Sequence, residues 1–294
     1  MNTDLLTEDE RRDFVRNGYV AKRGILDDDA CRRCLALSWR ELEKKSIRQD
    51  PSSWKANPYL RPRKGVVKLR DEVNRDPELL QLVGANQALN RVATALMGEQ
   101  TLPADVRGIY TTFPIPRLRA RPYDAHVEQH PVQIFVMLYL DDVTSRNAPM
   151  CVWPGTHTMV WRDFSSKFDY LPKPSFHPRF DRLNAFEPVE LIGKRGDAFF
   201  CHHRVMHGGS NNLRERVRFG ILVDFLRSDF EAMRAAEPGE EMWDYWSDAV
   251  HATAARREGL QPDPLRSSPP RSLMLKSLQT IRRLRGQRPD AYAP

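Results

Sequence analysis

The sequence predicts an α+β fold, mainly β, in which N-terminal helices precede a closed or double-layered β core. Before Met97, apolar residues recur at helical spacing. After Met97, short β-branched and aromatic runs alternate with Pro, Gly, Asn and Asp, which is typical of barrel or sandwich strands. Hydrophobic residues make up 40% of the 294 residues and charged residues 29%. This composition predicts one globular domain with appendages.

The helical part contains three predicted helices. Thr7 and Glu10 form a capping-box pattern, and Gly18 ends the first helix after Asn17. Residues 27–29 open a second helix, and a third runs from Asp76-Pro77 to Gly98. Cys31 and Cys34 spell CxxC, but no second such pair accompanies them. We interpret both as ordinary residues of the second helix rather than zinc ligands.

The strand-like part ends near residue 228, where helical patterns resume. Its predicted strands are the runs "RGIYTTF", "PVQIFVMLYLDD", "PMCVWPG", "EPVELIG", "GDAFFCHH" and "RVRFGILVDFL". We therefore predict one domain, the N-terminal helices with the β core, over residues 1–228, and a C-terminal helical extension with a basic tail over 229–294.

Charge and hydropathy indicate a cytoplasmic location. The polar N-terminus has no secretory pattern, and the longest apolar run, Ile134–Leu140, is far shorter than the roughly 20 residues of a membrane span. The net charge of +7 is concentrated in the segment from Arg256 onward, which contains nine basic and three acidic residues. A solvated appendage is the favoured interpretation of this tail, with a nucleic-acid or membrane contact as the alternative.

The stretch "DAHVEQH" predicts half of a metal site. On an extended strand, His126 and Glu128 project to the same side. A third ligand would come from His202, His203 or His207, which gives the two-histidine, one-carboxylate set of non-haem Fe(II) oxygenases. A hydrogen-bonded surface pair is the alternative. A helical conformation would instead bring His126 and His130 together.

Three blocks of the chain resemble the phytanoyl-CoA dioxygenase-like family of Fe(II)- and 2-oxoglutarate-dependent oxygenases. They are "LTEDERRDFVRNGYVAKRGIL", "LYLDDVTSRNAPMCVWPGTHT" and "GDAFFCHHRVMHGGSNNLRERVRFG", and the resemblance runs from about residue 6 to about residue 225. It implies a double-stranded β-helix, the cupin-like jelly-roll, flanked by N-terminal helices. It also implies an enzyme that uses Fe(II), 2-oxoglutarate and O2 to oxidise a C–H bond of a small organic molecule, with release of succinate and CO2.

The resemblance assigns residues to roles. In the family, a Gly-Asp pair precedes the distal iron ligand and an arginine follows that ligand by eleven residues; here these are Gly196-Asp197, His207 and Arg218. His126, Glu128 and His207 are thus the implied iron ligands and catalytic centre. Arg218 is the implied partner of the far carboxylate of 2-oxoglutarate. Without the resemblance, Arg218 would be read as an arginine on an exposed strand edge.

Two departures from the family pattern stand out. The family usually has Asp where this chain has Glu128, a carboxylate that also disfavours halogenation. The family often has a serine near the cosubstrate where this chain has Gly209, with Ser210 one position late. Gln133 is the predicted replacement, because it alternates onto the face of Met137; the alternative is that Gln133 satisfies a backbone group at the strand end.

The substrate is expected to be a small molecule, and one feature of the sequence, a row of arginines, favours an anionic substrate. Arg117, Arg119 and Arg121 alternate in an extended segment that leads into the metal motif, so Arg119 and Arg121 are candidate substrate contacts. A solvated strand face is the alternative. Two other functions stay open: a jelly-roll that has lost catalysis and binds a ligand, and an oxygenase acting on nucleic acid through its basic tail. The near-neutral remainder of the chain disfavours nucleic acid.

Overall fold

The computed structural model describes residues 5–55, 57–60, 65–114 and 125–256. Its main sheet has six antiparallel strands in the order β1-β7-β4-β9-β3-β2. In chain order these are β1 Tyr19–Lys22, β2 Val66–Leu69, β3 Asp105–Thr112, β4 Ile134–Tyr139, β7 Ala198–His202 and β9 Arg218–Phe225.

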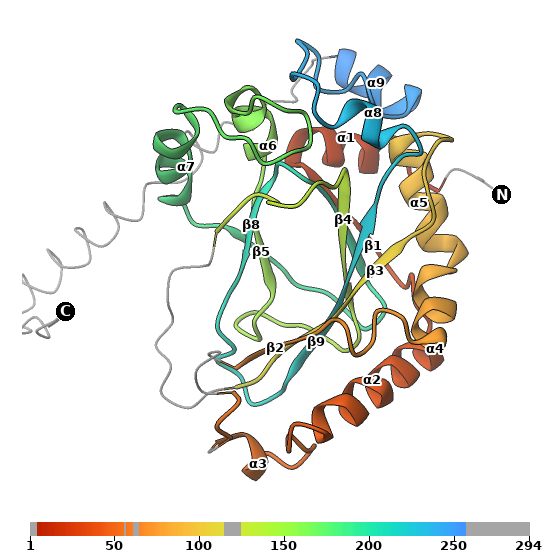
Figure 1. Cartoon of the computed structure of the whole chain (residues 1–294), viewed down its shortest axis with the longest axis vertical. Coiled ribbons are helices and arrows are strands. Elements are labelled where there is room, and N and C mark those ends of the chain that lie inside the picture. The colour runs from red at the N-terminus through yellow and green to blue at the C-terminus, as the bar shows by residue number, and fades with distance from the viewer. Residues whose placement is uncertain (1–4, 56, 61–64, 115–124, 257–294) are drawn as a thin grey trace, which may run out of the picture.

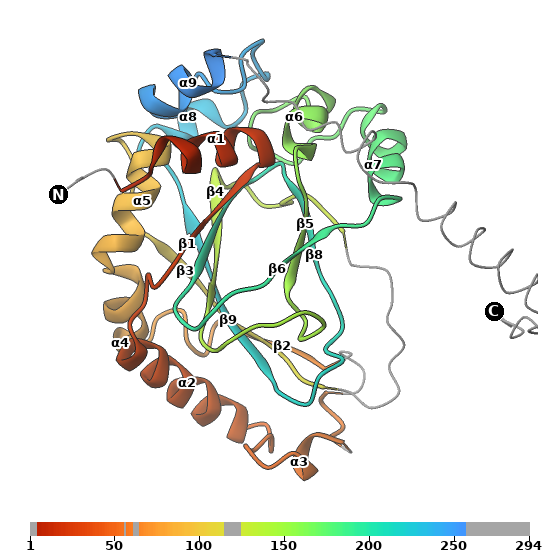
Figure 2. The ribbon, with the colours of Figure 1, turned by 180° about the vertical axis from the view of Figure 1, so that it is seen from behind.

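A smaller sheet faces the main one. It has the order β6-β5-β8 and consists of β5 Met150–Trp153, β6 Val189–Leu191 and β8 Met206–Gly209. Figures 1 and 2 show β5, β6 and β8 on one side of the main sheet and the helices α2 (Asp28–Glu43), α4 (Pro77–Leu79) and α5 (Gln87–Met97) on the other. This arrangement confirms the predicted double-stranded β-helix with flanking helices.

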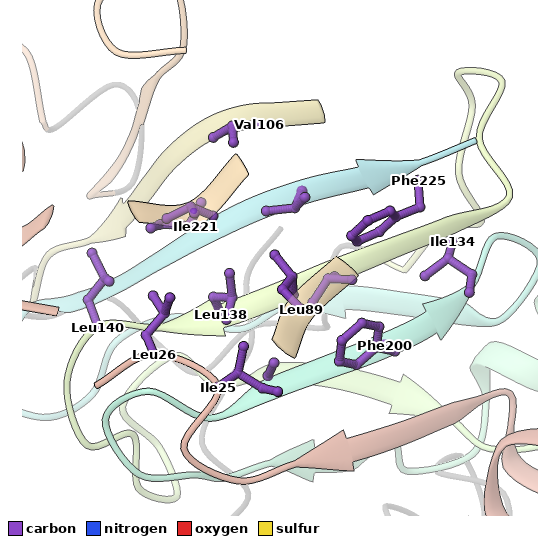
Figure 3. Packing of buried hydrophobic residues seen from close by; sticks show 14 of the residues in the cluster. Ile25, Leu26, Leu89, Val106, Ile134, Leu138, Leu140, Phe200, Ile221 and Phe225 are labelled. Atoms are coloured by element: carbon purple, nitrogen blue, oxygen red, sulfur yellow. The ribbon is translucent and has the colours of Figure 1, made fainter. Parts of the chain in front are cut away.

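Strand alternation divides the main sheet into two faces. On β4 the even-numbered residues, such as Ile134 and Leu138, belong to the core beneath the helices, whereas Phe135 and Met137 belong to a second cluster between the sheets. On β9, Ile221 and Phe225 lie on the helix side as well, as Figure 3 shows. The inward face of these strands is therefore the face available for a site.

The N-terminal helices form as predicted, with one exception. α1 (Glu8–Asn17) begins at the Thr7–Glu10 capping box and ends at left-handed Gly18, and Cys31 and Cys34 are buried free thiols of α2. The single helix predicted for residues 76–98 is instead broken. α4 continues as a π-helical segment, Leu80–Gly84, and α5 then restarts at Asn86, whose side chain accepts a hydrogen bond from the Leu89 N–H.

Short helices cover the ends of the sheets. They are α3 Ser52–Lys55, α6 Thr156–Val160, a 3-10 turn at Trp161–Asp163, α7 Phe176–Asn184, α8 Phe230–Met233 and α9 Asp248–Ala255. Trp243 and Trp246 of the C-terminal extension pack against Phe14 of α1, with ring centroids 6.0 and 5.2 Å apart. The division at residue 228 stays a prediction, and most of the basic tail lies outside the described residues. Among the described helices, none combines the length and apolarity needed to cross a membrane.

Candidate functional site

A cavity of about 500 Å³ opens between the two sheets. Its wall is made by inward positions of the main sheet and by β8 of the small sheet. The residues that line it are Val66, Lys68, Arg70, Arg107, Tyr110, Thr112, His126, Glu128, Gln129, His130, Phe135, Met137, Met150, His207, Gly208, Gly209, Ser210, Arg218, Leu222 and Asp224.

The structure brings His126, Glu128 and His207 together at this cavity. Residues 125–129 are extended and not helical, and His126 exchanges two backbone hydrogen bonds with His207, of 2.8 and 2.9 Å. The two imidazole rings lie 4.3 Å apart between centroids. Glu128 follows on the same side, and its Oε1 lies 3.5 Å from Nε2 of His207. The pairing of the metal motif with β8 therefore places three donor side chains side by side.

The donor atoms are oriented for a cation. Nδ1 of His207 lies 3.0 Å from the Val205 carbonyl oxygen, to which it donates, and Nε2 is the ring nitrogen that faces Glu128. Nε2 of His207 and Oε1 of Glu128 lie 3.5 Å apart, a spacing at which the two atoms can share either a proton or a metal ion. Neighbouring ligands of an octahedral metal at roughly 2.1 Å would be separated by about 3 Å, so the residues present fit such an ion.

A cluster that the sequence interpretation missed surrounds Glu128. Arg107 Nη1 donates to Glu128 Oε1 at 3.3 Å, and His130 Nδ1 contacts Glu128 Oε2 at 3.0 Å. Both residues also contact Asp224: Arg107 through Nε at 3.0 Å and through Nη2, and His130 through Nε2 at 2.9 Å. His130 is thus a second contact of the carboxylate, as expected for a neighbour of the ligands rather than a ligand.

A β-bulge directs Arg107 into the cavity. The pairing of β3 with β9 shifts between Val106 and Gly108, so Arg107 and Tyr110 both face inward although they are three residues apart. Gly108 has φ +138°, and a Cβ there would lie 2.3 Å from the Leu69 carbonyl oxygen. The isolated glycine within a strand pattern was the available sequence signal for this bulge.

Electrostatics keep this cluster charged. Burial acts to raise the pKa of Glu128, but hydrogen bonds from His130 and His207 and the nearby Arg107 cation hold that pKa well below its ordinary value. Hydrogen bonds to Asp224 and Glu128 raise the pKa of His130 to about 9. Glu128 is therefore an anion at neutral pH, as a metal ligand must be.

The ligand set is assembled but not in a finished coordination geometry. Across residues 5–55, 57–60, 65–114 and 125–256, no three His, Cys, Asp or Glu side chains form a complete metal-binding group. The oxygens of Glu128 are shared instead among Arg107, His130 and His207. A metal would compete with Arg107 for Oε1, while His130 would keep Oε2.

Arg218 lies in the same cavity and is almost fully buried. Its Nε donates to the Ala148 carbonyl at 3.1 Å and its Nη1 to the Tyr110 carbonyl at 3.2 Å, and no carboxylate among the described residues pairs with it. Burial lowers the pKa of the guanidinium. A buried arginine held only by carbonyls is complementary to an anion that the protein itself does not supply.

Gln133 is a predicted cosubstrate contact that the structure places elsewhere. It precedes β4, its amide Nε2 donates to the Tyr245 carbonyl at 2.8 Å, and it does not line the cavity. Phe135 and Met137 line the cavity, whereas the Gln133 amide contacts the C-terminal extension. Gln133 instead joins the barrel to the C-terminal extension. Ser210 does line the cavity, beside Gly209.

The other histidines lie away from the cavity. His157, His202 and His203 are fully buried, and His157 contacts the Val15 carbonyl through Nε2 at 3.1 Å. His202 stacks on Trp246 at 4.9 Å between ring centroids. Position in the fold therefore separates His207 from His202 and His203. Arg117, Arg119 and Arg121 lie outside the described residues.

Comparisons with known proteins agree with this architecture. A sequence model of the phytanoyl-CoA dioxygenase family, PhyH, matches residues 14–220. No curated protein sequence matches the chain. EctD from S. alaskensis, solved with 2-oxoglutarate and 5-hydroxyectoine, has 16% identity and a TM-score of 0.55, over 90% of this chain and 88% of EctD.

Two further solved structures share the fold. SnoK, a non-haem α-ketoglutarate-dependent carbocyclase from nogalamycin biosynthesis, has 19% identity and a TM-score of 0.54, over 81% of this chain and 95% of SnoK. HygX from Streptomyces hygroscopicus, solved with nickel and 2-oxoglutarate, has 12% identity and a TM-score of 0.51, over 76% of this chain and 88% of HygX. At these identities the structures are similar in fold alone.

Proposed function

Because the chain belongs to the phytanoyl-CoA dioxygenase family, we propose that it oxidises a C–H bond of a small organic molecule at an iron bound by His126, Glu128 and His207. Members of the family are Fe(II)/2-oxoglutarate-dependent enzymes, so the predicted enzyme class is confirmed. Hydroxylation is the favoured outcome, with desaturation or cyclisation as variants of the same oxidation. The ligand assignment, the role of Arg218 and the nature of the substrate are the parts that we propose.

One observation supports the proposal above all others. The three donor side chains and a buried arginine without an acidic partner among the described residues line a single cavity. The donors come from the segment before β4 and from β8, and Arg218 comes from the start of β9, so only the folded barrel brings them together. A ligand-binding jelly-roll without catalysis would not require donors of this kind beside a cation.

Each protein group has a distinct task in this proposal. When bound, Fe(II) and 2-oxoglutarate supply the oxidising chemistry, in which O2 and 2-oxoglutarate yield succinate, CO2 and the oxygen atom inserted into the substrate C–H bond. Arg218 would bind the far carboxylate of 2-oxoglutarate and fix its direction in the cavity. The inward apolar side chains of Phe135, Met137 and Leu222 limit the access of water to the reacting centre.

The direct test is an anaerobic titration of metal-free protein with Fe(II) and 2-oxoglutarate, followed by the visible absorption band of iron-chelated 2-oxoglutarate. We expect a band in the parent protein and none in His207→Ala. Arg218→Met should weaken 2-oxoglutarate binding by about tenfold or more, since it removes a charge-assisted pair.

A matched control is available two residues away. Arg216 is exposed, with 67% of its side chain accessible, and pairs with Asp141 outside the cavity. Arg216→Met should leave the titration unchanged. Absence of the band at any concentration in the parent protein would refute the iron assignment, and equal affinities for 2-oxoglutarate in the Arg218 and Arg216 variants would refute the role of Arg218.

A further inference from the structure

One wall of the cavity carries positive charge that neither the iron ligands nor the cosubstrate uses. This wall is β2 and the residue after it. Val67 and Leu69 are buried in the core, whereas Val66, Lys68 and Arg70 alternate toward the cavity. Lys68 and Arg70 are exposed at its mouth.

Arg70 is fixed in place by Tyr110. Its Nε donates to the Tyr110 hydroxyl at 2.8 Å, and the guanidinium carbon lies 5.6 Å from the centre of the ring. This contact occupies only the inner nitrogen of the guanidinium. No carboxylate among the described residues pairs with the Arg70 side chain, so the two terminal nitrogens form a fork available to a ligand.

The backbone also holds Arg70 at the cavity. A Cβ at position 108 would lie 3.0 Å from Cα of Arg70 and even closer to the Leu69 carbonyl. Only glycine at this position lets β2 approach the bulge so closely. The same bulge thus directs Arg107 to Glu128 and seats Arg70 over Tyr110.

The side chains that line the cavity carry a net positive charge, and this excess remains when Fe(II) and 2-oxoglutarate are bound. Four lysine and arginine side chains line the cavity, Lys68, Arg70, Arg107 and Arg218, against two carboxylates, Glu128 and Asp224, which also contact His130. Arg107 is matched by those two carboxylates. Bound Fe(II) and 2-oxoglutarate carry opposite charges of equal size, so they leave the excess of about two positive charges unchanged.

We propose that the substrate carries an anionic group, a carboxylate or a phosphate monoester, that is bound by the guanidinium fork of Arg70 with Lys68 beside it. The proposal rests on the proposed function in one respect: the bound anion belongs to the molecule that is oxidised. Arg70 is a specificity-determining residue in this account, because a neutral analogue would leave its terminal nitrogens without an acceptor.

The test uses three probes of similar shape: benzoate, phenyl phosphate and the neutral benzamide. Their binding is measured by anaerobic equilibrium dialysis against protein saturated with Fe(II) and 2-oxoglutarate, so that the cosubstrate covers Arg218. We expect at least one anion to bind about tenfold more tightly than benzamide. The tighter anion identifies the class of the substrate group.

The variants are Arg70→Gln and Lys68→Gln, with Arg91→Gln as a control on the exposed surface of α5, away from the cavity. Arg70→Gln should reduce the preference for anions to within about twofold, Lys68→Gln should reduce it partly, and the control should keep it. Equal binding of all three probes to the parent protein, or an anion preference that survives Arg70→Gln, would overturn the proposal. The Fe(II)–2-oxoglutarate band is recorded in the same samples: its absence counts against the proposed function, and its presence without anion preference counts against Arg70 alone.

Discussion

Two groups of histidines in this protein have opposite environments. His126, His130 and His207 line the cavity and contact Glu128, Asp224 or each other. The second group, His157, His202 and His203, is fully buried between the barrel and the C-terminal extension, where the rings face Trp161, Trp243, Trp246 and Phe168. Their contacts are with aromatic rings and with backbone carbonyl and N–H groups.

Residues 202–207 contain both kinds of histidine, because the chain changes sheets between His202 and His207. β7 ends at His202, whose side chain lies on the helix side with Phe200, and β8 begins at Met206 after a turn. The turn moves the chain from the main sheet to the small sheet, so His207 faces the cavity. Burial lowers the pKa of His202 and His203 well below the ordinary value, whereas hydrogen bonds to carboxylates raise that of His130. A histidine becomes a candidate ligand through a neighbouring carboxylate and access to a cavity.

The largest expected difference between the groups is in iron affinity. His126→Ala should weaken Fe(II) binding by more than about 100-fold, since removal of a ligand exceeds the 10- to 100-fold effect typical of its neighbours. His202→Phe keeps the stacking on Trp246 and should change the affinity by less than about twofold. Anaerobic competition with a coloured chelator measures both values. Similar losses in the two variants would remove the distinction between the groups.

The buried group should make the protein sensitive to acid. Burial lowers the pKa of His157 to about 4. The unfolded chain, with a histidine pKa near 6.5, therefore binds more protons than the folded one between pH 6.5 and 4, and the free energy of unfolding falls as the pH falls through this window. Over the whole window, protonation of His157 should lower the free energy of unfolding by about 3 kcal/mol. Urea denaturation of metal-free protein at pH 7 and pH 5 measures most of it.

His157→Gln should reduce this loss between pH 7 and pH 5, whereas His177→Gln, on the exposed side of α7, should not. His130, in the cavity group, should affect the pH dependence of stability in the opposite direction. His130 has a raised pKa of about 9, so its stabilisation is complete below pH 6.5 and is lost as the pH rises through 9. An identical pH profile for the His157 and His177 variants would contradict the proposed role of burial.

A smaller effect is expected from the residues that surround Glu128. Asp224 binds Arg107 through two nitrogens and so limits the pairing of Arg107 with Glu128. Asp224→Asn should weaken Fe(II) affinity by about tenfold, because the unpaired Arg107 would then compete for the carboxylate. The double variant Arg107→Met/Asp224→Asn should recover most of the affinity. A double variant as weak as the single one would show that Asp224 acts by another route.

The smallest effect concerns Gln133. Because its amide contacts the Tyr245 carbonyl and not the cavity, Gln133→Leu should leave the dissociation constant of 2-oxoglutarate within about twofold of the parent value. Loss of the hydrogen bond should instead lower the free energy of unfolding by about 1 kcal/mol. The Fe(II)–2-oxoglutarate band and urea denaturation measure the two quantities. A tenfold loss of 2-oxoglutarate affinity would restore Gln133 as a cosubstrate contact.

Periodicity and motif order predicted the fold, and their failures have local causes. Alternation places Met137 on the inward face of the regular strand β4, where it lines the cavity, whereas the family resemblance, not the strand pattern, predicted that Arg218 faces inward. Arg107 escaped prediction, because the bulge at Gly108 changes which side chains face inward. The π-helical turn before Asn86 likewise interrupts a continuous apolar pattern. Asp224 lies on a predicted strand, β9, and Arg70 directly follows β2, which was not among the predicted strands. In both cases only the tertiary structure shows what the side chain contacts.

The central claim is that the cavity group, and not the buried group, holds the iron. Crystals soaked anaerobically with Fe(II) and measured at the iron absorption edge locate the metal directly through its anomalous scattering. We predict a single peak between His126, Glu128 and His207, with Arg107 displaced from Glu128. A peak among His157, His202 and His203, or no peak in crystals that bind 2-oxoglutarate, would contradict the account.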